Sequence, residues 1–96
     1  MYDNKKRYLI TYDLNSQGQD YENVIAAIKK ASDGNWCSYW KSSFLIRSNY
    51  QTADEVMAII MPYIDKNDRI IAIEVVNNYQ GWLTKEQWNY IHNNIF

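Results

Sequence analysis

The residue whose type and position best suit chemistry is Asp13, which follows the aliphatic and aromatic run 8–12. A carboxylate at the end of a buried strand is held rigidly at a sheet edge, where catalytic groups are often fixed. One carboxylate alone is a poor Mg²⁺ site, because the ion usually takes one or two carboxylates together with water and substrate phosphate. Two copies of Asp13 facing each other across a two-fold axis would supply a pair. The competing interpretation is a turn in which Asp13 hydrogen-bonds the backbone two residues further on.

Nucleophilic and zinc chemistry have little support in the sequence. Cys37 and His92 are the only cysteine and histidine, and neither has a ligand or base at a suitable spacing. The sequence contains no CxxC, HExxH, GxSxG or glycine-rich phosphate-binding motif. We therefore interpret Cys37 as a buried structural thiol and His92 as a residue near a helix end.

Aromatic residues make up 16% of the chain, including 4 Trp and 9 Tyr. Several of them fall within residues 36–50, where they could stack on the bases of single-stranded RNA. In a chain this aromatic, the same residues are also expected in the core or at a dimer interface. We favour the core or interface interpretation.

The net charge of −1 provides no general attraction to a phosphate backbone. Nucleic acid therefore stays a candidate partner that charge does not strongly support. The single cysteine predicts a reducing, cytoplasmic environment. No apolar run is long enough for an export signal or a membrane span, so we expect no membrane association. The amino-acid composition, rich in Lys, Asn and Ile, favours an AT-rich bacterial or phage genome.

Hydrophobic spacing predicts the elements that would position these residues. Strands are expected at 8–14, 35–40, 43–48 and 69–76, and helices at 20–32, 52–64 and 84–96. Lys41-Ser42 predicts a tight hairpin connection, and Gly34 provides the positive φ that ends the first helix.

Helix-capping signals mark the beginnings of the helices. Asp20 is a predicted N-cap, and Thr52–Glu55 and Thr84–Gln87 are predicted capping boxes. Pro62 is expected to kink or tighten the last turn of the second helix.

The 96 residues form one predicted domain (1–96), with a core at 7–76 and a helical extension at 83–96. The order of elements predicts an α+β fold, a ferredoxin-like βαββαβ sandwich with an additional C-terminal helix. Two helices would cover one sheet face. The other face, rich in aromatic residues, would be covered by a second copy, so we expect a homodimer.

Three features of the sequence together resemble a known family. They are the opening YLITYDLN, the later stretch MPYIDKNDRIIAIEV and the order of the elements between them. Over residues 8 to about 76 the chain resembles the small CRISPR-associated ferredoxin-fold adaptation endoribonucleases and their stand-alone relatives. The virulence-associated protein D ribonuclease toxin is a cousin of that family in fold.

The resemblance implies a function for the end of the first strand. By motif position Asp13 would be the catalytic residue and the metal ligand, with Mg²⁺ shared across the dimer for phosphodiester cleavage. Tyr12 and Asn15, next to it in sequence, would contact the substrate. The chain departs from the family pattern at residues 15–23, which contain no basic residue, and at 84–96, which predict a helix where many members have a strand.

Two functional hypotheses follow from these observations. The first is a metal-dependent endonuclease, possibly acting on RNA. The alternative is a catalytically inactive homodimeric binding or regulatory module, such as a phage counter-defence protein that captures a protein or a small ligand. An antitoxin or transcription-related role has no specific support, since neither a helix-turn-helix spacing nor a basic recognition helix is present.

Overall fold

The computed structural model describes residues 3–15 and 19–96. In this part the chain is a small α+β protein with a four-stranded antiparallel sheet and three α-helices, as predicted at this level. The elements are β1 (Lys6–Asp13), α1 (Gln19–Ala31), β2 (Trp36–Trp40), β3 (Ser43–Ser48), α2 (Ala53–Ile60), η1 (Met61–Tyr63), β4 (Arg69–Val75), α3 (Lys85–Tyr90) and η2 (Ile91–Ile95).

The strands lie in the order β2-β3-β1-β4, and each neighbouring pair is antiparallel. The first strand of the chain is therefore central. In its register Leu9 lies opposite Leu45 of β3 on one side and Ile73 of β4 on the other. Directly opposed residues share a sheet face, so this register assigns every side chain of β1 to one of two faces.

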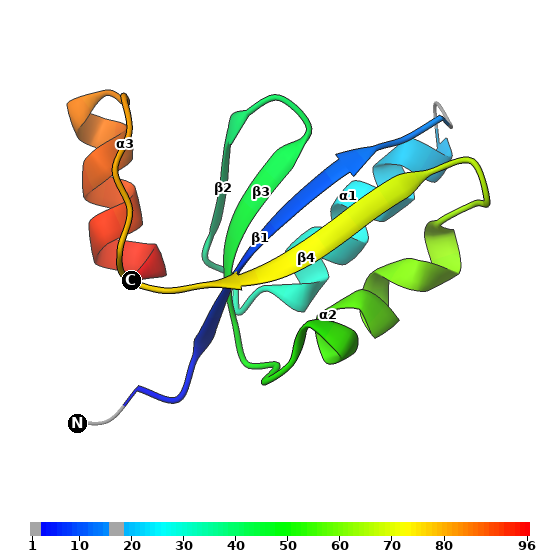
Figure 1. The fold of residues 1–96 in the computed structure, drawn as a ribbon, viewed down its shortest axis with the longest axis horizontal. Coiled ribbons are helices and arrows are strands. Elements are labelled where there is room, and N and C mark those ends of the chain that lie inside the picture. Colours follow the sequence, from blue (N-terminus) through cyan, green and yellow to red (C-terminus); the bar gives the residue numbers. More distant parts are fainter. Residues whose placement is uncertain (1–2, 16–18) are drawn as a thin grey trace.

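The first face is covered by α1 and α2, which lie side by side along the sheet (Figure 1). The side chains of Tyr8, Ile10 and Tyr12 alternate along β1 onto this face, and all three are buried. Apolar residues of the two helices and of β3 complete the core: Val24, Ala27, Ile28, Ala31, Phe44, Ile46, Val56 and Ile60.

The hairpin between β2 and β3 turns through Lys41 and Ser42, as predicted. Ser42 has a φ of 57°, the left-handed conformation that follows a type I turn in many tight hairpin connections. A register irregularity between Cys37 and Trp40 returns Trp40 to a position opposite Ser43. The turn is also held to the central strand, because the backbone amide of Tyr12 donates to the Ser42 carbonyl at 3.1 Å.

Two capping predictions need correction. Helix α1 begins at Gln19, so Asp20 lies inside its first turn and is not the N-cap. Its negative charge there interacts favourably with the positive end of the helix dipole. Thr52 does cap α2 by accepting from the Glu55 amide at 3.2 Å. The Glu55 carboxylate, however, accepts from the backbone amide of Gln51 and not of Thr52. The chain before Thr52 bends far enough to bring the Gln51 amide within reach.

The ends of the other helices agree with their sequence signals. Gly34, shortly after α1, has a φ of 103°. Pro62 lies in η1, the tight 3₁₀ turn that follows α2, so the proline tightens the end of that helix as predicted. The Thr84–Gln87 capping box is complete, since Thr84 accepts from the Gln87 amide and Gln87 accepts from the Thr84 amide.

The second face of the sheet is covered at one end by the C-terminal helix, which Figure 1 shows away from α1 and α2. A second apolar cluster forms there from Cys37, Leu45, Ile91 and Ile95. The prediction left this whole face to a second copy of the chain. The amphipathic spacing in 84–96 was sufficient to predict the helix, but it carried no information about which surface the helix packs against.

Arg7 fastens this C-terminal segment to the sheet. Its Nε donates to the Ile95 carbonyl at 2.6 Å, and one Nη donates to the Phe96 carbonyl at 3.4 Å. The guanidinium also lies 5.8 Å from the centre of the Phe96 ring. A cation near the carbonyl end of a helix is favourably placed, so Arg7 both caps and positions η2.

Within residues 3–15 and 19–96, no helix is long and apolar enough to cross a membrane.

Candidate functional site

Asp13 is the last residue of β1, as predicted, and its side chain is exposed. It shares the second face of the sheet with Leu9 and Thr11, because side chains two apart on a strand point the same way. β1 is paired with β3 as far as Thr11, and its pairing with β4 continues to Asp13, which lies opposite Arg69. The carboxylate is thus presented to solvent from a well-anchored strand end.

The predicted turn at Asp13 does not form. The backbone amide of Asn15, the donor that such a turn would use, instead donates to Oδ1 of Asp68 at 2.7 Å. Arg69 does not neutralise Asp13 either, because one of its Nη atoms donates to the carbonyls of Lys66 and Asp68 at 3.1 and 2.8 Å. Among the residues that the structure describes, the side chain of Asp13 has no hydrogen bond or ion pair. Its carboxylate oxygens remain available to a ligand.

Asp68 is a polar residue whose role the sequence did not reveal. It is buried, and its two carboxylate oxygens accept from the backbone amides of Asn15 at 2.7 Å and Asp65 at 3.0 Å. These bonds tie the exit of β1 to the loop before β4. Four polar residues in a row at 65–68 indicate a loop, but nothing in that pattern marks which carboxylate turns inward.

Tyr12 and Asp13 project to opposite faces of the sheet. Tyr12 is buried in the core below α1, with its ring edge-on to Tyr21 at 6.2 Å and stacked on Phe44 at 6.4 Å. Burial, and secondarily the hydrogen bond with Tyr21, raises the pKa of Tyr12 far above its usual range. The structure therefore does not bring the Tyr12 phenol together with the Asp13 carboxylate. The two-residue period of a strand already implies this separation.

Asn15, the second predicted substrate contact, is exposed just beyond the end of β1. Its backbone amide is held by Asp68, which fixes the chain at this point. The Asn15 side chain lies two residues beyond Asp13, at the rim of the same sheet end.

The immediate surroundings of Asp13 on the second face are hydroxyl-bearing and aromatic. Thr11 lies opposite Ser43, and the two side-chain oxygens are 3.1 Å apart. Trp40 lies opposite Ser43 on the next strand. These residues were not among the predicted site residues, although their position follows once the register of the strands is known.

The described residues of one chain provide only some of the ligands that a metal ion needs. Within residues 3–15 and 19–96 there is no group of three or more His, Cys, Asp or Glu side chains that could hold an ion. Asp68 cannot pair with Asp13 for this purpose, because its oxygens are engaged by backbone amides. The exposed carboxylate of Asp13 suits a hard divalent cation, and water, substrate or a second protomer could add ligands that the described residues do not provide.

A groove of about 600 Å³ lies on the same face of the sheet as Asp13. Its floor includes Leu9 and Leu45 of the sheet, and its walls include Trp40, Leu83 and Trp88. Tyr79 also lines it and stacks between Phe96 and Trp88, with ring centres 4.7 and 6.0 Å away. The groove is mainly apolar and aromatic, and Glu74 is the one charged residue among those that line it.

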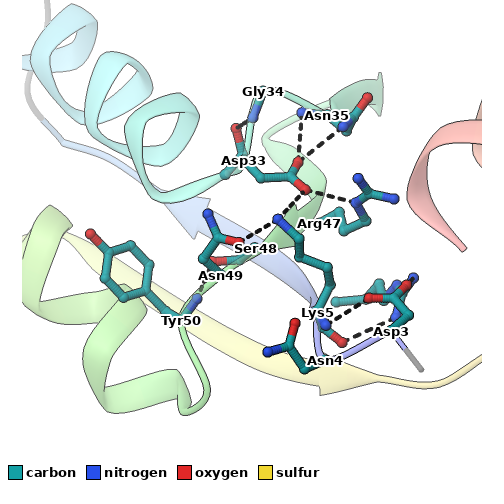
Figure 2. Close-up of polar contacts among 12 residues, drawn as sticks. Asp3, Asn4, Lys5, Asp33, Gly34, Asn35, Arg47, Ser48, Asn49 and Tyr50 are labelled. Atoms are coloured by element: carbon teal, nitrogen blue, oxygen red, sulfur yellow. Dashed lines mark hydrogen bonds and ion pairs between the residues drawn. The ribbon is translucent and has the colours of Figure 1, made fainter. Parts of the chain in front are cut away.

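A half-buried polar cluster is centred on Asp33, which follows α1 (Figure 2). Its carboxylate accepts from Nε of Arg47 at 2.7 Å and from the backbone and side-chain nitrogens of Asn35 at 3.1 and 3.0 Å, and pairs with Nζ of Lys5 at 3.3 Å. Burial alone would raise the pKa of Asp33, but the bonds from Arg47, Asn35 and Lys5 hold it below its usual range. Because Lys5 and Arg47 both bind this one carboxylate, we interpret the cluster as structural.

Cys37 and His92 have the places that the sequence predicted. Cys37 is buried in the second apolar cluster, and burial raises the pKa of its thiol to about 11. His92 is exposed on η2 at the C-terminal end of the chain. A neutral buried thiol is a poor nucleophile, so Asp13 and the groove are the features that remain for function.

No protein-family model matches this chain, and no curated protein matches it.

Proposed function

We propose that this chain is a metal-dependent endonuclease of the CRISPR-associated adaptation type, with a ferredoxin-like fold, acting as a homodimer on RNA. The observation that carries the proposal is the exposed carboxylate of Asp13, unpaired among the described residues, at the end of the central strand. The strand order β2-β3-β1-β4, with two helices on one face, supports the ferredoxin-like part.

In the proposed dimer, the Asp13 carboxylates of the two protomers lie across the two-fold axis and hold one Mg²⁺ between them. Asp13 is exposed on the second face, so a partner sheet can approach its carboxylate. A divalent ion held there would stabilise the charge that develops on the phosphodiester oxygens and activate a water for attack. Asn15, at the rim, is the proposed substrate contact. Tyr12 acts from the core side, where it supports the strand that carries Asp13.

The test compares Asp13→Asn with the wild-type chain in Mn²⁺ or Mg²⁺. Labelled single-stranded RNA, duplex RNA and DNA are incubated at low salt, with EDTA as the metal-free arm. Because the carboxylate is the proposed ligand, the variant is expected to lose about 100-fold or more of the cleavage rate. Asp54→Asn is the matched control, since Asp54 is an exposed aspartate on α2 and its loss should leave cleavage unchanged.

Thermal unfolding of the same proteins separates chemistry from structure. Asp13→Asn should keep the unfolding temperature and the dimer. If cleavage and folding are lost together, Asp13 is a structural residue. If the wild-type chain neither binds nor cleaves any of the nucleic acids with either metal, the endonuclease proposal fails.

A second candidate function is a catalytically inactive homodimeric binding module, and the aromatic groove favours it. A phage counter-defence protein that holds a protein or small ligand would need such a surface and no metal. The net charge of −1 and the absence of basic residues in 15–23 also favour this function over strong nucleic-acid binding. Under this alternative Asp13→Asn is silent in every assay, while substitutions in the groove abolish binding.

A further inference from the structure

The largest exposed apolar side chain lies beside the groove. Trp82, in the segment between β4 and α3, is 98% exposed. Further apolar side chains on the same face of the sheet or beside it are partly open: Val76 at 67%, Ile71 at 52%, Ile73 at 46% and Trp40 at 38% exposure. Exposed apolar residues that gather on one face mark an interaction site, whereas isolated ones do not.

The groove is large enough to receive an aromatic side chain. Its volume of about 600 Å³ falls inside the range of roughly 300–1,000 Å³ in which proteins bind whole organic groups. Trp40 and Trp88 on its walls offer ring faces and edges to an incoming indole, and Leu9 and Leu45 offer an aliphatic floor. A tryptophan in a pocket of this kind is the most frequent type of binding hot spot.

The occupant that fits best is a second copy of this chain. Trp82 also lines the rim of the groove, so one surface carries both the projecting group and its receptor. A two-fold axis pairs such a surface with itself, since each residue then contacts the same partner in both directions. Glu74 is the one charged residue among the groove residues, so little charge repulsion arises between the two grooves, while a polyanion finds no attraction there.

The exposed area is also sufficient for a dimer. The five partly or fully exposed apolar side chains present roughly 600 Å² per protomer, against roughly 800 Å² per partner in an interface of standard size. The polar groups and backbone between these side chains would provide the remainder. A small ligand in the groove would leave Ile71 uncovered, because Ile71 is not among the residues that line the groove.

We propose that the chain dimerises through this face, with Trp82 of each protomer seated in the aromatic groove of the other. The inference rests on the homodimer of the proposed function and names the surface and the anchoring residue. Asp13 belongs to the same face of the sheet, so a face-to-face pair encloses both carboxylates between the two sheets.

The test measures self-association by sedimentation velocity over a concentration series. The dissociation constant of Trp82→Ala should rise about 30-fold or more relative to wild type, as expected for a tryptophan hot spot, and Trp82→Phe should recover part of the affinity. Met61→Ala is the matched control, because Met61 is 53% exposed on η1, outside this face, and its loss should change nothing. Thermal unfolding is compared at a protein concentration where the control is also monomeric, because dimerisation itself raises the unfolding temperature. There Trp82→Ala should unfold at the same temperature as the control, since Trp82 is 98% exposed in its own chain.

The outcomes separate this inference from the proposed endonuclease. If Trp82→Ala dimerises as tightly as wild type, the groove is not the dimer interface and the inference fails, while a shared Asp13 site on another interface survives. If wild type is monomeric at millimolar concentration, both the inference and the shared metal site fail. If Trp82→Ala is monomeric but wild type neither cleaves RNA nor binds Mn²⁺, the dimer interface is confirmed and the endonuclease fails.

Discussion

The two faces of the sheet are covered by different helices and to different extents. On the first face, α1 and α2 bury Tyr8, Ile10 and Tyr12 completely or nearly so. On the second face, α3 and η2 cover one end and leave Ile71 and Ile73 about half exposed. Both faces are made by the same strands, so the difference lies in what packs against them. The first face provides stability to the isolated chain, and the second has surface available for binding.

The sharpest test of this contrast is a pair of isoleucine truncations on neighbouring strands. Ile10→Ala removes a fully buried side chain from the first face and should lower the free energy of unfolding by about 3 kcal/mol, because a cavity is left. Ile71→Ala removes a half-exposed one and should cost less than about 1 kcal/mol. Urea unfolding at low protein concentration measures both. Equal losses at the two positions would contradict the distinction between the faces.

Asp33 connects the two faces of the sheet. It follows α1, which covers the first face, and it binds Arg47, which lies opposite Arg7 on the second face. Asp33→Asn should lower the free energy of unfolding by about 1–3 kcal/mol at neutral pH, since the two cations lose their charged partner. Unfolding at pH 7 by urea gives the value, and Asp54→Asn on the exposed surface of α2 is the control.

The pH dependence of that loss has a definite sign. The folded pKa of Asp33 is below its usual value, so its stabilisation is complete above about pH 4 and disappears as the pH falls through the folded pKa. Wild type should therefore lose more stability than Asp33→Asn between about pH 4 and pH 2. If the free energies of unfolding of the two proteins fall in parallel over that interval, ionised Asp33 does not stabilise the fold.

Substitution of Arg7 measures how strongly this residue holds η2 against the second face of the sheet. Arg7→Met keeps the aliphatic stem but removes the bonds to the carbonyls of Ile95 and Phe96, so the free energy of unfolding should fall by about 1–2 kcal/mol. Hydrogen exchange of the amides in η2 should accelerate by more than that of the amides in α1. Lys6→Met, which loses only an exposed pair with Glu74, should change stability by less than about 0.5 kcal/mol. Uniform acceleration throughout the chain would mean that η2 unfolds only with the whole domain.

Cys37, below the C-terminal helix, allows a test that changes no residue. Burial and a pKa of about 11 keep the thiol neutral and inaccessible, so labelling by a disulfide reagent at pH 8 should be about 100-fold slower in the folded chain than in urea. The same reaction should be faster in Arg7→Met, where η2 is released more often. Rapid labelling of the wild-type chain would show that the covered end of the second face is already open.

Local signals in the sequence predicted most of the elements. The strand at Asp13, the hairpin at Lys41 and the capping box at Thr84 depend on residues close together in the chain, and all three are present. Asp20 differs from its prediction because α1 already includes Gln19. Glu55 differs because the path of the backbone before α2 brings the Gln51 amide to its carboxylate in place of the Thr52 amide. Such a path depends on tertiary packing, which a short window does not contain.

The candidate site was predictable to a lesser degree. The position of Asp13 at a strand end follows from the apolar run before it, and strand alternation suffices to place Tyr12 on the opposite face. The bond from the Asn15 amide to Asp68 joins residues 53 positions apart, so no local motif announces it. The groove likewise needs the register of β1 and β3 and the packing of α3, all of which are long-range properties.

The central position of β1 has a consequence for how the chain acquires its structure over time. Of the four strands β1 is made first, yet both of its partners, β3 and β4, lie far along the chain. The pairing of β1 with β4 closes a loop that spans most of the protein, and closing such a loop must precede the gain from pairing. Folding is therefore expected in milliseconds or longer, and during synthesis the Asp13 strand must wait for β4 before its second edge is protected.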